Sequence, residues 1–178
     1  MTNMKQLILR GTYVGDEGLN ELAKLTKLTR LLVRNTSITD DGMQHLKSLI
    51  NLEHLDCNET AVGDAGVAAL ADLKKISQLE LWNTLTSDKG LETIRELTNL
   101  EWLTLDGTTV TDKGVATLAS LPKLSTLELN QAGITDESLM GVGEATALTS
   151  MAINNTKATA EGKAELLKAK PGLKVAGP

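Results

Sequence analysis

The chain has 178 residues, a formal net charge of −5, 41% hydrophobic residues and a single cysteine, Cys57. This length allows one soluble domain with a core, and the acidic balance argues against nucleic-acid binding, which needs a basic surface. One cysteine excludes an internal disulfide and a multi-cysteine metal site, and no apolar run is long enough to span a membrane. The first residues, MTNMKQ, lack the apolar segment of a signal peptide, and nothing in the composition assigns a compartment.

One sequence unit of 24 residues recurs along the whole chain without insertions. The segments LTRLLVRNTSITDDGMQHLKSLIN (28–51) and LEHLDCNETAVGDAGVAALADLKK (52–75) align throughout, and the next two segments align with them. The seven copies begin at residues 4, 28, 52, 76, 100, 124 and 148. A fixed period of this length is typical of a solenoid, in which each unit packs only against its neighbours.

Each copy predicts one strand followed by one helix. The segment L-x-L alternates with period two, which predicts a short strand with one inward face. The later run G-[LV]-x-x-L-x-x-L repeats at three, which predicts a short helix with one apolar stripe. A Thr follows the strand, except at Ala132 of the sixth copy, and its hydroxyl is expected to bond backbone groups at the turn.

An aspartate precedes the helical run in the first six copies. Its carboxylate is expected to accept hydrogen bonds from the first free N–H groups of that helix and to suit the positive end of the helix dipole. The residues concerned are Asp16, Asp40, Asp64, Asp88, Asp112 and Asp136.

Stacking seven such units predicts an α/β solenoid that winds right-handed. Its strands form a parallel sheet on the concave side, and its short helices lie on the convex side with aliphatic residues between the two layers. The pattern resembles the leucine-rich repeat family over essentially the whole chain. The T-D-x-G-L element most resembles the cysteine-containing and ribonuclease-inhibitor-like branches, and the repeats are similar to arrays in large bacterial surface and regulatory proteins. This resemblance implies a scaffold that binds proteins.

The two ends of the predicted array differ. The seventh copy has Ala160 in place of the aspartate, and residues 158–178 are interpreted as a C-terminal cap of a single domain, 1–178. Met4 opens the first copy at once, so the first core layer and sheet edge are expected to be exposed. Two explanations remain open: the chain is part of a longer array, or it associates with itself through that edge.

Strand periodicity predicts which side chains leave the core. The first, fourth and sixth positions of each copy are expected to face inward, and the third, fifth and seventh to face out of the concave surface. Cys57 then lies in the core, and His54 points the opposite way, so the two cannot form a catalytic dyad. Trp82 and Trp102 both point outward, with backbones roughly 14 Å apart on neighbouring strands.

The outward positions divide into a basic end, an acidic middle and a neutral end. We predict that the aromatic and acidic middle binds a basic, partly apolar protein or peptide, because exposed Trp beside unbalanced carboxylates is costly for a surface without a partner. Residues drifting on a solvated face would give the same pattern. The basic end has Arg10, Arg30 and Arg34 around Ile8 and Leu32, and the predicted binding residues are Arg30, Arg34, His54, Asp56, Glu80, Trp82, Trp102, Asp106 and Glu128.

The sequence provides little for catalysis. No base is oriented by a third group toward a nucleophile, and no metal or cofactor is predicted. We therefore predict a noncatalytic protein- or peptide-binding module. Two alternatives stay open: a structural spacer, and a recognition segment of a longer protein whose catalytic part lies outside this chain.

Overall fold

The computed structural model of the protein describes residues 3–178. One strand opens each turn of the coil, and each strand covers three residues. The strands are β1 (Gln6–Ile8), β2 (Arg30–Leu32), β3 (His54–Asp56), β4 (Gln78–Glu80), β5 (Trp102–Thr104), β6 (Thr126–Glu128), β7 (Ser150–Ala152) and β8 (Lys174–Ala176).

Each of the first seven strands is followed by a helix on the opposite layer. The α-helices are α1 (Asp16–Leu22), α2 (Asp40–Met43), α3 (Asp64–Ala68), α4 (Asp88–Ile94), α5 (Asp112–Thr117), α6 (Asp136–Val142) and α7 (Ala160–Ala169). Two 3-10 segments, η1 (Gln44–Ser48) and η2 (Leu118–Ser120), extend α2 and α5.

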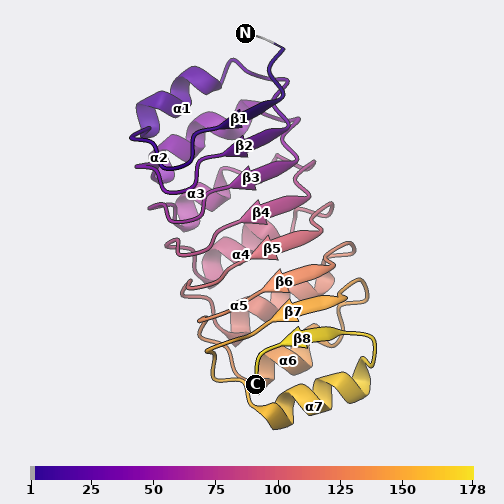
Figure 1. Cartoon of the computed structure of the whole chain (residues 1–178). Coiled ribbons are helices and arrows are strands. Elements are labelled where there is room, and N and C mark those ends of the chain that lie inside the picture. Colours follow the sequence, from indigo (N-terminus) through magenta and orange to yellow (C-terminus); the bar gives the residue numbers. More distant parts are fainter. Residues whose placement is uncertain (1–2) are drawn as a thin grey trace.

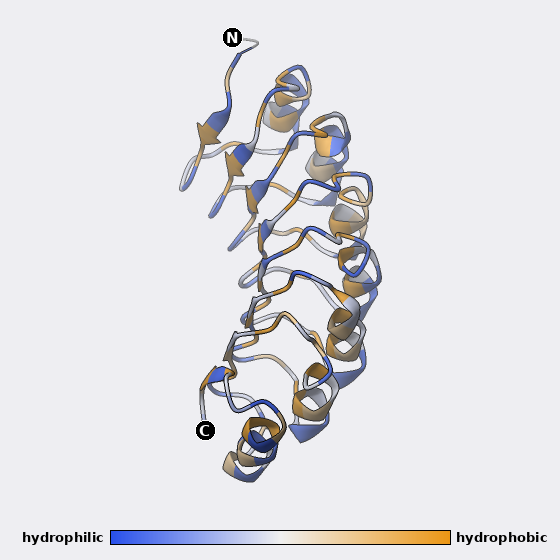
Figure 2. Ribbon diagram, turned by 90° about the vertical axis from the view of Figure 1, so that its right-hand side faces the viewer, coloured by the Kyte–Doolittle hydropathy of each residue, from blue (hydrophilic) through white to orange (hydrophobic). Residues whose placement is uncertain are grey.

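The eight strands form one parallel sheet in chain order, β1 to β8 (Figure 1). Residues at the same position of successive units are partners across the sheet, as in Arg30 with His54 and His54 with Gln78. Seen from the side, the sheet lines the inner side of a curved stack and the helices line the outer side (Figure 2). This is the predicted solenoid of an open parallel sheet and short helices.

The core is a continuous stack of aliphatic side chains between the two layers. The inward strand positions contribute fully buried residues in register, among them Leu31, Leu55, Leu79 and Leu103. The helix positions of the repeat supply the other half of the layer, because their apolar stripe faces the sheet. A solenoid built this way buries its apolar surface mainly between neighbouring units.

The repeated aspartates cap the next helix rather than their own, which corrects the expectation from the sequence. Asp64 is the first residue of α3, and its Oδ1 accepts hydrogen bonds from the backbone N–H groups of Ser87 and Gly90 at 2.8 and 2.9 Å. Its Oδ2 accepts from the Ser87 hydroxyl at 2.6 Å. The same bond to the residue before the next helix recurs in every described unit that has the aspartate. Each carboxylate therefore joins two neighbouring units.

This bond explains the glycine in the T-D-x-G element. A Cβ on Gly90 would lie 2.9 Å from Asp64 Oδ1, closer than real Cβ contacts allow. In the sixth unit Ser138 replaces the glycine, and both its N–H and its hydroxyl donate to Asp112. In the units that have glycine, the carboxylate of the preceding unit occupies the space that a side chain would take.

The turn after each strand has one residue with a positive φ. The predicted threonine follows it, and its hydroxyl donates to the carbonyl three residues earlier, as Thr60 does to Cys57 at 2.6 Å. This confirms the role expected for the threonine. The positive-φ residues are Gly11, Asn35, Glu59, Asn83, Gly107, Gln131 and Asn155. For Glu59 and Gln131 this conformation costs more free energy than it does for Gly or Asn.

The two ends of the stack are covered to different extents. At the C-terminal end Leu166 of α7 and Leu173, the residue before β8, are buried in the core. At the N-terminal end Leu7 and Leu9 are only partly buried and β1 has one unpaired edge within residues 3–178. None of the helices among these residues is long and apolar enough to cross a membrane.

Candidate binding surface

The concave surface consists of three columns of side chains, the third, fifth and seventh positions of each unit. Trp102, a third-position residue on β5, is 42% exposed, whereas the neighbouring Leu103 is buried. Cys57 is fully buried in the core, and burial raises the pKa of its thiol, with a further increase from the charges of Asp56 and Glu80. The opposite orientations predicted for Cys57 and the outward columns are thus confirmed.

Asp56 departs from this pattern, because its side chain is 0% exposed. The Arg10 side chain crosses over β2 and donates to Asp56 Oδ2 from Nε at 3.0 Å and from Nη2 at 2.6 Å. Leu32, which lies on β2 between them, is 1% exposed. The expectation that Asp56 is an exposed, unbalanced carboxylate is therefore wrong: the charge is buried and compensated, as a buried carboxylate requires.

Glu80 lies beside Asp56 in the sheet register and has its own partners. His54 Nε2 lies 2.7 Å from Glu80 Oε1, and Asn58 Nδ2 donates to Glu80 Oε2 at 2.9 Å. The hydrogen bond with His54 lowers the pKa of Glu80, and burial acts in the opposite direction. Like charges on neighbouring strands repel each other, and here Asp56 and Glu80 each have separate partners that offset this repulsion. His54 belongs to this network, so it is not a free surface group.

Trp82 and Arg34 contact each other. The guanidinium carbon of Arg34 lies 4.8 Å from the centroid of the Trp82 ring, which is a cation–π contact. Arg34 Nε also donates to Glu59 at 2.8 Å. Trp82 is accordingly only partly exposed. These two residues hold each other in place, and among the outward strand columns the more exposed aromatic side chain is that of Trp102.

Arg30 differs from the other two arginines of the basic end. No ion pair or side-chain hydrogen bond joins it to another residue of 3–178, and its Nε is buried. A buried donor without an acceptor costs about 1–3 kcal/mol. Arg30 is therefore the concave arginine whose hydrogen-bonding capacity the described chain leaves unused.

Glu128 is a diagonal neighbour of Trp102 across the sheet, and Asp106 follows β5, four residues after Trp102. Neither carboxylate has a cationic partner within residues 3–178. Asp106 accepts from the backbone N–H and the amide of Asn130, at 2.7 and 2.8 Å. Burial raises the pKa of Glu128, the negative charges of Asp106 and Glu80 raise it further, and a hydrogen bond from Thr104 acts against them. This part of the surface has an excess of negative charge beside an exposed indole.

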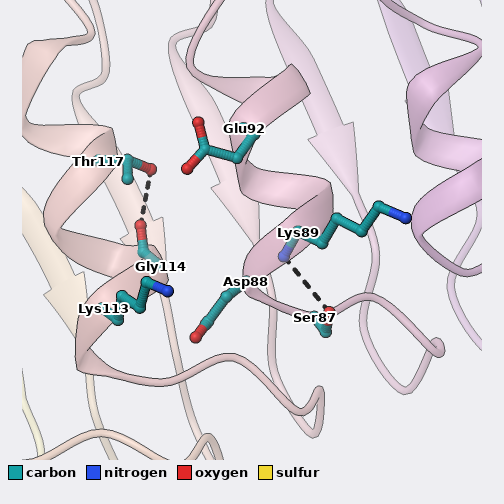
Figure 3. A pocket seen from close by; sticks show the side chains of 7 residues that line it. All are labelled: Ser87, Asp88, Lys89, Glu92, Lys113, Gly114 and Thr117. Atoms are coloured by element: carbon teal, nitrogen blue, oxygen red, sulfur yellow. Dashed lines mark hydrogen bonds between the residues drawn. The ribbon is translucent and has the colours of Figure 1, made fainter.

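A hollow lies elsewhere, on the convex side between α4 and α5 (Figure 3). It has a volume of about 500 Å³ and is lined by Ser87, Asp88, Lys89, Glu92, Lys113, Gly114 and Thr117. Asp88 is one of the capping aspartates, and Lys89 donates its backbone N–H to Ser87. The hollow is the junction between two successive helices. Its lining contains both acidic and basic side chains, as is typical of a solvated surface.

The sequence interpretation missed one feature of the site. A ladder along the seventh column ties the strand ends together, in which Asn58 Oδ1 accepts from the N–H of Trp82 and Asn130 Oδ1 from that of Asn154. The recurrence of Asp and Asn at the seventh position is the sequence feature that indicates this ladder. Within residues 3–178 no group of three or more His, Cys, Asp or Glu side chains is arranged to hold a metal ion.

Comparison with known proteins identifies the fold. No protein-family model and no curated protein matches the chain. Among solved structures, an internalin (InlF) from Listeria monocytogenes strain 4b F2365 aligns with 98% of this chain and 48% of its own, with a TM-score of 0.81 and 23% identity. Internalin C2 from the same strain aligns with 97% of this chain and 80% of its own, with a TM-score of 0.72 and 22% identity. The chain spans about half the length of the first.

These similarities, together with the open parallel sheet and short helices, define the class of protein. The chain is a leucine-rich-repeat solenoid. At identities of 22 and 23%, the two internalins are similar to it in fold.

Proposed function

We propose that the chain is a noncatalytic scaffold that binds a protein or peptide on its concave surface. The observation that carries this proposal is Trp102, which is 42% exposed and has Glu128 as a diagonal neighbour in the sheet. Neither Glu128 nor Asp106, at the end of β5, has a cationic partner among residues 3–178. Exposed Trp at the centre of a surface is typical of residues that dominate binding energy.

The proposed partner has basic and apolar side chains. A cation would relieve the charge repulsion that raises the pKa of Glu128, and an aliphatic or aromatic side chain would cover the indole of Trp102. The preferred surface consists of Trp102, Asp106 and Glu128, with Glu80 and Trp82 at its border. Asp56 is buried beneath this surface and holds the Arg10 side chain in place through their hydrogen-bonded ion pair.

The organisation of the chain supports this use. We propose one domain, 1–178, of seven units with a cap over 158–178. The proposed similarity to the ribonuclease-inhibitor-like branch rests on the T-D-x-G-L element alone. Self-association through the edge of β1 stays a prediction, favoured by the partly exposed Leu7 and Leu9. Sedimentation at several concentrations tests it, because a dimer through this edge dissociates on dilution.

Capture from an extract of the source organism tests the proposed function. Wild-type protein, a Trp102→Ala variant and a Met140→Ala control are immobilised at equal amounts after their folding is checked. Met140 is also exposed but lies on α6, on the convex layer. Proteins held by the wild type and the control and lost by Trp102→Ala support the proposal. Identical capture by all three proteins contradicts it and favours the spacer.

A further inference from the structure

Between β2 and β6 the concave surface carries unpaired charge of opposite sign at two separate places, and a further exposed cation, Lys174, lies on the edge strand β8. Arg30 on β2 has no acceptor within residues 3–178, and Asp106 and Glu128 on the units of β5 and β6 have no cation. Between them, Asp56 is paired with Arg10, and Glu80 is hydrogen-bonded to His54 and Asn58, so both carboxylates have partners within the chain. The residual charge is therefore ordered along the stack, positive near β2 and negative near β6.

We infer that the partner is an extended segment with an acidic residue over Arg30 and a basic residue over Asp106 and Glu128. This inference rests on the proposed function, since it names the partner of the same surface. A segment with only basic residues would leave the Arg30 guanidinium without an acceptor. A carboxylate accepts from a guanidinium through two parallel hydrogen bonds, and complementary charges fix the register of a bound chain.

The apolar side chains of the surface fit the same orientation. Ile8 is 59% exposed on β1, diagonally next to Arg30, and Trp102 is 42% exposed next to the carboxylates. Each charged place thus has an exposed apolar side chain beside it. The partner is expected to carry an apolar residue near each of its two charges.

The sheet geometry gives the separation of the two charges. Arg30 and Glu128 are four strands apart and two positions apart along the strand. With about 4.8 Å between strands and about 3.3 Å per residue, the two positions lie roughly 20 Å apart. An extended chain covers this distance in about six residues. The acidic and basic residues of the partner are therefore expected about six positions apart.

A displayed library of random dodecapeptides tests this spacing. Selection on the wild type is expected to enrich peptides with one acidic and one basic residue about six positions apart. Selection on Arg30→Gln is expected to lose the acidic preference and keep the basic one. Selection on Asp106→Asn, Glu128→Gln is expected to lose only the basic preference. Lys113→Gln is the matched control, because Lys113 is an exposed cation on the convex helix α5, and this variant is expected to select as the wild type does.

The outcomes separate this inference from the proposed function. Peptides that depend on Trp102 and carry a basic residue, but show no acidic preference or no fixed spacing, overturn the inference and leave the proposed function standing. An acidic preference that survives in Arg30→Gln also overturns it. Absence of any enrichment on the wild type contradicts both. For a selected peptide, Arg30→Gln is expected to weaken binding about tenfold, the loss of one charged hydrogen-bonded contact.

Discussion

Asp64 on α3 accepts a hydrogen bond from the backbone N–H of Gly90 on α4, at 2.9 Å, and so caps the helix of the following unit. We expect Asp64→Ala to lower the free energy of unfolding by about 2 kcal/mol, since it removes a charged acceptor with three donors. Urea denaturation measures this, with the exposed Asp72→Ala as the control. A loss no larger than that of the control contradicts the capping role.

The same pair predicts coupling between two substitutions. Gly90→Ala is expected to destabilise the wild type, because the new Cβ meets Asp64 Oδ1 at 2.9 Å. In the Asp64→Ala background this contact is absent, so Gly90→Ala is expected to cost less there. The double-mutant cycle measures the difference. Additive losses show that the carboxylate is not the reason for the glycine.

Gln131 has a φ of 59° at a position where Gly107 has 63°. Left-handed backbone costs a residue with a Cβ about 1–2 kcal/mol relative to glycine. We expect Gln131→Gly to raise the free energy of unfolding by about 1 kcal/mol, and Gly107→Ala to lower it by a similar amount. Thermal or urea denaturation of both variants checks the prediction, and a destabilised Gln131→Gly contradicts it.

Arg10 compensates the buried carboxylate of Asp56. Breaking a buried pair by removing one partner costs about 3–5 kcal/mol, and less here because Arg10 is half exposed. We expect Arg10→Gln to cost about 2 kcal/mol, and Arg10→Gln, Asp56→Asn to recover most of that loss, because no uncompensated charge stays buried. Equal stability of the single and double variants would contradict the pairing.

Glu128 predicts a pH dependence of stability. The pKa of Glu128 is raised in the folded protein. The stability that protonated Glu128 contributes is therefore fully present below the pKa of the unfolded chain, about 4.3, and is lost as the pH rises through the folded pKa. Glu128→Gln, which mimics the protonated form, is therefore expected to stabilise the protein at pH 7 and to have little effect below pH ~4. Glu101→Gln, at an exposed position, is the control. A Glu128→Gln effect that does not change with pH contradicts the assignment.

The architecture follows from the sequence because local periodicity encodes it. Alternation places Leu55 and Leu79 inward, and the constant repeat length puts them in register, so the sheet and core need no information from distant contacts. The same reasoning identifies Trp102 as an outward residue and Cys57 as a core residue.

The pairing of charges could not be predicted in this way. Arg10 reaches Asp56 across an intervening strand, 46 residues away in sequence, and a residue's column does not tell how far its side chain extends. The aspartate pattern was likewise ambiguous, because Asp64 precedes the apolar run of its own helix while its carboxylate reaches the next one. Both features depend on contacts between units, which the repeat of one unit does not contain.

The affinity of the captured partner for Trp102→Ala tests the central claim most directly. Isothermal titration compares the wild type, Trp102→Ala and the convex control Met140→Ala, after equal stability is established. If the concave surface is the binding site, Trp102→Ala loses about 2 kcal/mol or more of binding free energy, as expected for a central Trp, and the control binds as the wild type does. Equal affinities of the wild type and Trp102→Ala would show that the partner binds elsewhere and would contradict the account.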